Sequence, residues 1–207
     1  MGSLNSAIIA TFFVSGKDIR DFGSNNAGLT NVYRCFGKLA AGLTLLFDFA
    51  KGVVVIIAAR LPFMLNLLDK SQYDVLTVCG VAILFAIFGH SFPVFYGFKG
   101  GKGILIAGVC MLFADPVVFL CEFVLFVVTV ALSRYISLGS ILCCIGYPVL
   151  TFIWQTVGVT YLNLDYKNIW IHTLLALLAG IFCFVRHMPN VKRLINHEEN
   201  KFVLRKD

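Results

Sequence analysis

Long apolar runs, separated by short polar or charged stretches, dominate this sequence. A helix that crosses a bilayer needs roughly 20 predominantly apolar residues, and several of the runs approach that length. Their ends are placed at the first charged or turn-forming positions, to within a few residues. The pattern predicts an all-α membrane protein with seven helical segments, at residues 3–15, 39–60, 73–92, 103–115, 116–133, 138–160 and 168–186.

The first and fourth segments are the shortest. Residues 3–15 fall below the roughly 20 residues of a spanning helix, so Met1 is expected to lie downstream of the natural start. The fourth and fifth segments meet at Asp115 and Pro116. Proline cannot continue a helix but suits the first turn of the next one. A tight helical hairpin is therefore predicted at this position.

Composition agrees with a membrane location. Hydrophobic residues make up 59% of the 207 positions and charged residues only 14%, whereas a soluble domain carries roughly 25% charged residues. No polar linker divides the chain, which predicts a single transmembrane domain over residues 1–207. The seven cysteines lack C-x-x-C spacing and most lie in apolar runs. We therefore expect them to be packing residues.

The basic residues are distributed unevenly between alternate loops. With the N-terminus outside, the inside loops are residues 16–38, 97–102, 133–137 and the tail after 185. Outside loops hold only Arg60, Lys70 and Lys167. Because cytoplasmic loops are enriched in Lys and Arg, the C-terminus is predicted to be cytoplasmic, and the net charge of +6 indicates anionic lipid rather than nucleic acid as a partner. The inside residues are Lys17, Arg20, Arg34, Lys38, Lys99, Lys102, Arg134, Arg186, Lys192, Arg193, Lys201, Arg205 and Lys206.

Two long polar blocks fall in these inside loops. The first, Gly23–Arg34, reads G-S-N-N-A-G-L-T-N-V-Y-R and combines hydrogen-bonding groups with a guanidinium suited to phosphate. The second, Gly89–Gly103, reads G-H-S-F-P-V-F-Y-G-F-K-G-G-K-G. Glycines allow close approach of backbone N–H groups to an anion. The spacing differs from a nucleotide-binding P-loop, and His90 alone more often serves packing than catalysis.

Two shorter blocks are more ambiguous. Ser133–Ser140, S-R-Y-I-S-L-G-S, fits either a polar pocket or capping of the next helix by Ser137. Arg186–Arg193, R-H-M-P-N-V-K-R, fits a helix at the membrane surface that begins near Pro189. Its basic residues can also contact anionic lipid.

Charged residues also occur in the interior of two predicted helices, at Asp48 and Lys51 in one and at Glu122 in another. Asp48 and Lys51 are three residues apart, so they can pair on one helix face. Ionisable groups inside a membrane helix are costly and often functional, but a structural pair facing the bundle fits equally well. Glu122 has no evident partner in the sequence.

Taken together, the blocks resemble the acyl-phosphate-dependent glycerol-3-phosphate acyltransferases of bacteria, the PlsY family. That family's first motif is approximately G-S-G-N-x-G-A-T-N-x-x-R, from which this chain departs at Asn25 and Leu29. Its second, G-H-x-F-P-V-F-x-x-F-K-G-G-K-G, is matched at every fixed position. Its S-L-x-S is matched by Ser137–Ser140, and its final H-x-x-N by His187 and Asn190.

The resemblance implies a seven-helix enzyme of the bacterial inner membrane with its active site facing the cytoplasm. It would transfer a fatty acyl group from acyl phosphate to the 1-hydroxyl of sn-glycerol 3-phosphate, giving lysophosphatidic acid and phosphate. Neither a cofactor nor a metal is implied. The implied partners are the two substrates, the lipid bilayer and, through supply of the donor, an enzyme that produces acyl phosphate.

Carried over residue by residue, the resemblance implies catalytic roles for His187, Asn190 and Ser24. Lys102 and Arg34 are expected to hold the phosphate of glycerol 3-phosphate, and either His187 or the acceptor's own phosphate is expected to take the proton. The implied substrate-binding residues are Gly23, Asn26, Thr30, Asn31, Arg34, His90, Lys99, Gly100, Gly101, Lys102, Gly103, Ser137 and Ser140.

A small transporter or binding protein for phosphorylated metabolites is the alternative interpretation. Glycine-rich inside loops and charges within helices suit that function as well. Transporters often contain internal repeats with interrupted helices in both halves. The four blocks here are not alike, which favours the enzyme.

Overall fold

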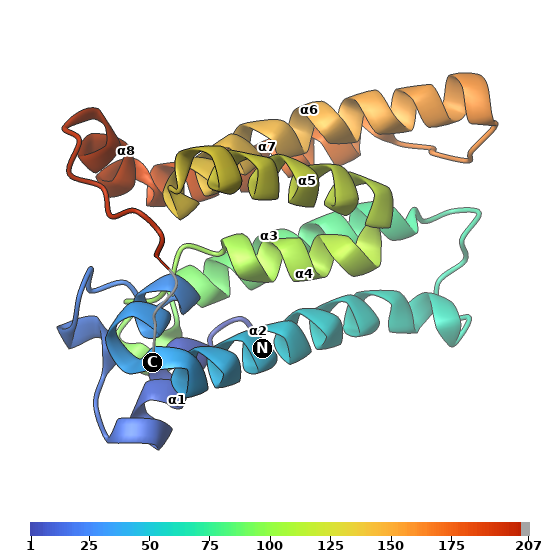
Figure 1. Ribbon diagram of the computed structural model, residues 1–207. Helices are drawn as coiled ribbons and strands as arrows, with labels where there is room; N and C mark the ends of the chain where they lie inside the picture. Colours follow the sequence, from blue (N-terminus) through green and yellow to red (C-terminus); the bar gives the residue numbers. More distant parts are fainter. Residues whose placement is uncertain (204–207) are drawn as a thin grey trace. The chain divides into compact units, whose positions relative to one another are not determined.

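The computed structural model describes residues 1–203, and the regular structure there is entirely helical (Figure 1). This confirms the predicted all-α class. Arg205 and Lys206, counted above in the cytoplasmic tail, lie outside the described residues. The α-helices are α1 (Ser6–Ser15), α2 (Leu29–Met64), α3 (Val75–Ser91), α4 (Ile104–Ala114), α5 (Pro116–Ser133), α6 (Ile136–Leu162), α7 (Ile169–Arg186) and α8 (Met188–Ile195), with short 3₁₀ turns η1 (Ile19–Asp21) and η2 (Val94–Tyr96).

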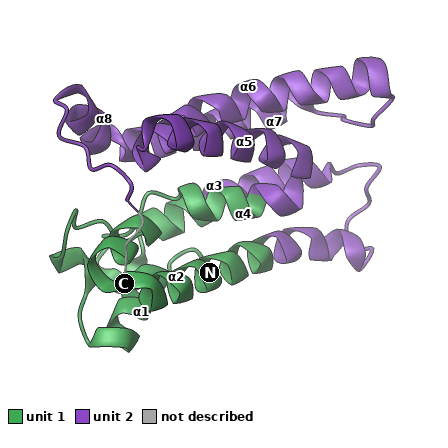
Figure 2. Ribbon diagram, in the orientation of Figure 1, with its two compact units in different colours: residues 1–55, 85–110, 204–207 green, residues 56–84, 111–203 purple. Residues whose placement is uncertain are grey.

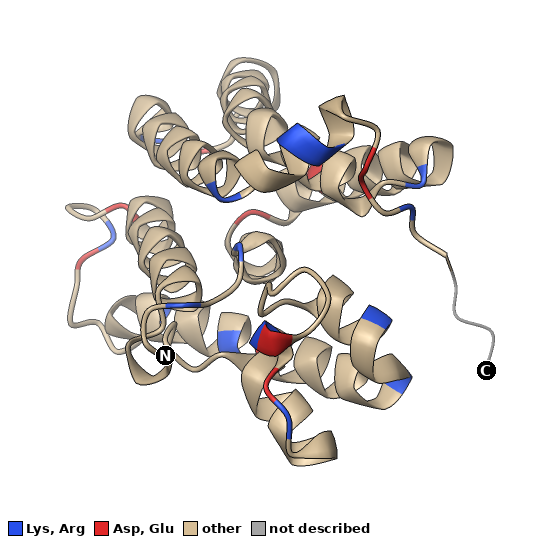
Figure 3. Ribbon diagram, turned by 90° about the vertical axis from the view of Figure 1, so that its left-hand side faces the viewer, with Lys and Arg blue, Asp and Glu red and all other residues tan. Residues whose placement is uncertain are grey.

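Each of the seven predicted segments overlaps one of the helices α1 to α7, although α2 and α6 extend beyond the predicted bounds at both ends. Five of them, α2, α3, α5, α6 and α7, are long and apolar enough to cross a membrane, and uncharged residues make up most of the ribbon in Figure 3. At 1.5 Å per residue, the 10 residues of α1 and the 11 of α4 extend only about half of a ~30 Å hydrocarbon core. The chain is therefore an integral, multi-pass membrane protein with two shorter apolar helices.

The start of α2 differs from the prediction. Residues 16–38 were expected to form a loop, but the helix begins at Leu29 and continues to Met64, with a break at Gly37. Gly37 takes φ 81° and ψ −168°, a conformation open to glycine but strained for other residues. The second half of the first polar block is therefore helical. The apolar run after residue 38 revealed only the part of the helix that follows the break.

Several helix ends confirm local predictions. Asp115 caps α5 by accepting a hydrogen bond from the Val118 amide, and Pro116 is the first residue of that helix. Pro189 lies in the first turn of α8, as expected. Ser137 does not cap α6, because the capping position is Tyr135 and no side-chain capping bond is made there. The capping interpretation of Ser137 was therefore wrong.

The chain divides into two compact units (Figure 2). Among the described residues, unit 1 comprises residues 1–55 and 85–110, and unit 2 comprises 56–84 and 111–203. In unit 1, α1, η1 and the first part of α2 share a small core that includes Ala7, Ile19 and Val32. The single domain over residues 1–207 stays a prediction.

In unit 2, α6 packs against both α5 and α7, and α8 contacts α6 and α7. The approach of α6 and α7 is close, because a side chain at Gly180 would overlap the backbone carbonyl oxygen of Cys144. Glycine at this crossing lets the two backbones meet. Cys144 and Cys183 are buried in the same bundle, in agreement with their predicted packing role.

Candidate functional site

The first polar block folds around the Asn31 side chain. Asn31 is 2% exposed, and its amide nitrogen donates to the carbonyl oxygens of Phe22 (2.9 Å) and Asn26 (3.1 Å). Its side-chain oxygen accepts from the backbone amide of Ser24 at 3.0 Å. Because one side chain bonds the loop at three points, Asn31 fixes the backbone from Phe22 to Asn26. Asn31 thus orders the loop in the structure.

Two loop positions require left-handed backbone. Gly23 has φ 60°, and a side chain there would overlap the Asn31 side-chain oxygen. Asn25 has φ 56°, and its side-chain nitrogen donates to the carbonyl oxygen of Arg20 at 2.7 Å. Asparagine tolerates this region better than most residues. Asn25 therefore adopts a left-handed geometry that glycine would also allow.

The other predicted site residues of this block lie around the ordered loop. Ser24 and Arg34 are exposed, whereas Asn26 and Thr30 are half-buried. Arg34 lies in the first turns of α2, on the helical part of the block. Ser24 and Arg34 are thus accessible to a ligand on unit 1.

The second block begins at the end of α3 and returns to it. The Gly100 amide donates to the Ser91 carbonyl at 3.1 Å, and the Gly101 amide donates to the His90 carbonyl at 3.2 Å. Side chains at either glycine would overlap His90, at its carbonyl oxygen for Gly100 and at ring Nε2 for Gly101. Both glycines are therefore required for packing the loop against the helix end. His90 is 4% exposed.

The lysines of this loop have different environments. Lys99 is exposed, Lys102 is half-buried, and Gly103, which is buried, leads into α4 with φ 90°. The loop also contacts Arg20, whose Nη1 donates to the Tyr96 carbonyl at 2.6 Å. A hydrogen bond from the Arg20 guanidinium holds the pKa of the Asp18 carboxyl below its ordinary value, and Asp18 raises the pKa of Arg20 in turn. This link between Asp18–Arg20 and the second block was not anticipated from sequence.

The predicted site residues of unit 2 include a serine with an unsatisfied hydroxyl. Ser137, near the start of α6, is 8% exposed, and its hydroxyl oxygen has no hydrogen-bond partner within residues 1–203. Ser140, one turn later, donates instead to the Ile136 carbonyl at 3.0 Å. A buried hydroxyl without a partner is costly. The free energy lost at Ser137 is recovered if a bound polar ligand supplies the partner.

His187 and Asn190 lie at the junction of α7 and α8, and both are buried. His187 Nδ1 lies 2.7 Å from the Cys183 carbonyl oxygen. Because a carbonyl only accepts, Nδ1 carries a proton, and in the neutral ring Nε2 is then the acceptor nitrogen. The Asn190 amide donates to Glu199 Oε1 at 3.2 Å, and Arg193 Nε donates to Oε2 at 2.7 Å. Glu199 thus orients Asn190. Sequence analysis missed Glu199, although it is an acidic residue directly after a basic helix.

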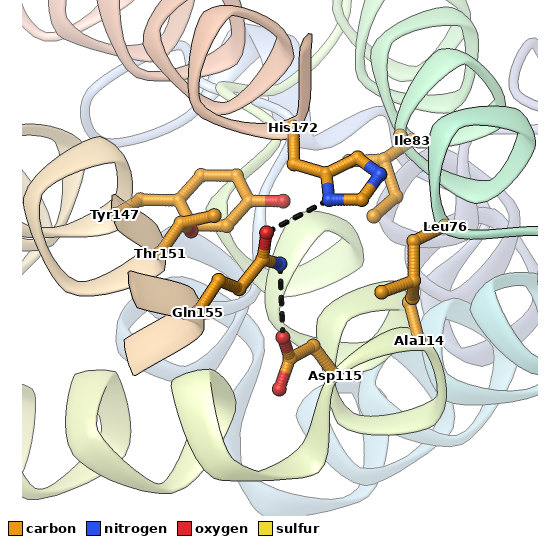
Figure 4. A pocket seen from close by; sticks show the side chains of 9 residues that line it. Leu76, Ile83, Ala114, Asp115, Tyr147, Thr151, Gln155 and His172 are labelled. Carbon is orange, nitrogen blue, oxygen red and sulfur yellow. Dashed lines mark hydrogen bonds between the residues drawn. The ribbon is translucent and has the colours of Figure 1, made fainter. Parts of the chain in front are cut away.

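A second polar cluster in unit 2 was also missed. His172 lies between the Asp74 carboxylate and the Gln155 side chain, with Nδ1 2.8 Å from Gln155 Oε1. Gln155 donates to Asp115 at 3.4 Å, as Figure 4 shows. His172, Gln155 and Asp115 line a cavity of about 30 Å³, which has room for a water molecule. The cluster joins α3, α5, α6 and α7, and its members are too far apart in sequence for spacing to reveal them.

Comparison with known proteins shows which family this chain resembles. A family model for glycerol-3-phosphate acyltransferase matches residues 1–197. Glycerol-3-phosphate acyltransferases of Chlorobium phaeobacteroides and Finegoldia magna are 37% and 35% identical, each over 97% of this chain and 92% and 90% of their own lengths.

Solved structures agree with the sequence comparison. The crystal structure of PlsY, an integral membrane glycerol 3-phosphate acyltransferase, in its glycerol 3-phosphate form is 30% identical with a TM-score of 0.72, over 98% of this chain and 90% of that one. The lysophosphatidic acid form gives a TM-score of 0.69 with 29% identity, over the same shares of the two chains. The chain therefore belongs to the glycerol-3-phosphate acyltransferase family, and to its PlsY type.

Proposed function

We propose that this enzyme transfers a fatty acyl group from acyl phosphate to the 1-hydroxyl of sn-glycerol 3-phosphate. The observation that carries the proposal is similarity over 98% of the chain to a PlsY solved in its glycerol 3-phosphate form. The products are lysophosphatidic acid and inorganic phosphate. The proposal is finer than family membership because it specifies the donor and the hydroxyl that is acylated.

Both substrates carry phosphate, so the residues of unit 1 are proposed to bind anions. Arg34 is exposed and Lys102 half-buried, and each offers a cation with several donors. We assign them to the phosphate of glycerol 3-phosphate. We assign the binding of acyl phosphate to the ordered loop that contains Gly23 and Ser24. Ser24 is exposed on this loop and so accessible to the substrate.

The residues of unit 2 are proposed to act at the reacting hydroxyl. The hydroxyl oxygen attacks the acyl carbonyl carbon, an ester C–O bond forms, and the bond from that carbon to the phosphate oxygen breaks. His187 Nε2 is the acceptor nitrogen of its ring, which suits a general base, and the acceptor's own phosphate is the second candidate for the proton. The buried Ser137 hydroxyl, which has no partner in the described residues, and Asn190 are assigned to substrate binding and orientation.

The membrane arrangement is also a proposal. Seven crossings with the N-terminus outside would place the Gly23–Arg34 and Gly89–Gly103 blocks and the α7–α8 junction in the cytoplasm. The excess of basic residues in those segments supports this through the positive-inside rule. Protease treatment of intact cells and inverted vesicles tests it, because a C-terminal tag should be cleaved only in the inverted vesicles.

The activity is tested with purified enzyme, palmitoyl phosphate and glycerol 3-phosphate, with lysophosphatidic acid as the measured product. Lys102→Ala is expected to abolish turnover, because the phosphate loses its cation. Lys167→Ala, in the exposed loop before α7, is the matched control and should retain the wild-type rate. Failure of folded wild-type enzyme to form product would disprove the acyl-phosphate reaction. A wild-type rate in Lys102→Ala would instead disprove only the assignment of that lysine.

A further inference from the structure

A buried lysine in unit 1 has three acceptors arranged around its ammonium group. Lys51 Nζ lies 2.9 Å from Asp48 Oδ1, 2.9 Å from the Leu4 carbonyl oxygen and 3.1 Å from His90 Nδ1. Lys51 is 7% exposed and Asp48 1% exposed. An ammonium group has three N–H donors and no acceptor. All three donors are therefore matched, and His90 Nδ1 must be an acceptor.

This arrangement determines the protonation of His90. A proton on Nδ1 would face an ammonium 3.1 Å away. The Asp48 carboxylate oxygen is farther from Nδ1, at 3.6 Å, and already accepts from Lys51 and Ser6, so the closer lysine determines a neutral ring with its single proton on Nε2. The Asp48 carboxylate has a further donor, because the Ser6 hydroxyl donates a hydrogen bond to its Oδ1 at 2.8 Å. A buried ion pair is tolerated only when further hydrogen bonds satisfy it, and that condition is met here.

The protonated nitrogen faces the glycine loop. A side chain at Gly101 would overlap His90 Nε2 and lie 2.7 Å from the carbonyl oxygen of Ala27. His90 Nε2 therefore lies where the second polar block meets the first. The Gly101 amide also donates to the His90 carbonyl, so the same residue contacts this loop through its backbone and its ring.

We propose that Asp48, Lys51 and His90 form a positioning triad that holds His90 in its Nε2–H form and thereby places the Gly100–Gly103 loop, with Lys102, against the first polar block. The triad touches no reacting atom and acts through the loop. Its effect on catalysis rests on the proposed function, whereas its effect on the tautomer does not. The triad also accounts for the two charges that the sequence placed inside a membrane helix.

The tautomer is tested directly by ¹⁵N NMR of enzyme labelled at its four histidines. The signals that disappear in His90→Gln identify His90. In wild-type enzyme they should show a protonated Nε2 and an unprotonated Nδ1. A protonated Nδ1, or a doubly protonated ring, would overturn the triad even if the enzyme proved to have another activity.

Two near-isosteric substitutions test the consequence for catalysis. His90→Gln keeps an N–H donor at the ε position, whereas His90→Asn keeps a polar group only at the δ position. We expect kcat/KM for glycerol 3-phosphate to be about tenfold lower in His90→Asn than in His90→Gln, the equivalent of one buried hydrogen bond. Equal activity in both variants, or greater activity in His90→Asn, would overturn the proposal.

His172→Gln is the matched control, because it makes the same change at a buried histidine of unit 2. It should lower the melting temperature without changing kcat/KM by more than about twofold, since its partners Asp74 and Gln155 belong to neither polar block. If His90→Asn does not fold, Lys51→Met with Asp48→Asn removes both charges while keeping volume. In that double variant the His90 signals should change to a mixture of tautomers, and retention of pure Nε2–H would contradict the triad.

Discussion

Removing His172 is expected to destabilise unit 2 without altering the chemistry. The side chain is 6% exposed and bonds both the Asp74 carboxylate and the Gln155 amide oxygen. In His172→Ala both groups lose a partner inside the bundle. Each buried polar group left unsatisfied costs about 1–3 kcal/mol.

The total is reduced because the Asp74 side chain is 14% exposed and water can replace part of the lost contact. We therefore expect a loss of about 3 kcal/mol in the free energy of unfolding. For a chain of this size, 1 kcal/mol shifts the melting temperature by about 2–4 °C. The predicted decrease is thus about 6–12 °C.

A thiol-reactive dye suits the measurement, because Cys79, Cys144 and Cys183 are buried in unit 2 and become reactive on unfolding. Asp165→Asn changes an exposed carboxylate in the same unit and should leave the melting temperature within about 2 °C, as surface changes usually do. If the melting temperature of His172→Ala fell by less than about 2 °C, the reasoning would be refuted, since the cluster would then contribute no stability to the bundle.

The remaining predictions concern four separate features. Ser137→Ala should raise KM for glycerol 3-phosphate while leaving the melting temperature unchanged or higher, because the wild-type hydroxyl has no partner in residues 1–203; an unchanged KM would contradict its assignment. Asn25→Gly should leave the free energy of unfolding unchanged. Asn25→Val should lower it by about 1–2 kcal/mol in a denaturant titration, because φ is 56° at this position and a β-branched residue is strained there. Glu122→Gln should keep the melting temperature within about 2 °C, since both carboxylate oxygens are buried without hydrogen-bond partners in the part of the chain that the structure describes, and a neutral group suits that position. A large decrease would show that the carboxylate is charged and paired. Burial raises the pKa of Asp74, but His172 and the hydrogen bonds from Thr77 and Asn168 outweigh it and hold the pKa below its ordinary value. The stabilisation that Asp74 provides should therefore be present above about pH 4 and lost as pH falls through the lower folded pKa, a loss that Asp74→Asn should not show.

The sequence was sufficient for features whose information is local. Apolar runs located the helices because a bilayer requires long uncharged segments. Asp115 and Pro116 defined a helix start through capping and the fixed φ of proline. The three-residue spacing of Asp48 and Lys51 predicted an ion pair that the structure contains. Long motifs identified the family because so many fixed positions rarely coincide.

Other features depended on tertiary structure because they join residues distant in sequence. The helix start at Leu29 depends on the fold of Gly23–Arg34, where Asn31 bonds loop atoms up to nine residues away. The sequence alone favoured a packing role for His90. The structure places the Lys51 ammonium, 39 positions earlier in the chain, 3.1 Å from His90 Nδ1. The His172 cluster spans 98 positions. Periodicity reports which face of a helix is buried, but a tautomer or a shared hydrogen bond is decided by the atom that tertiary packing places opposite.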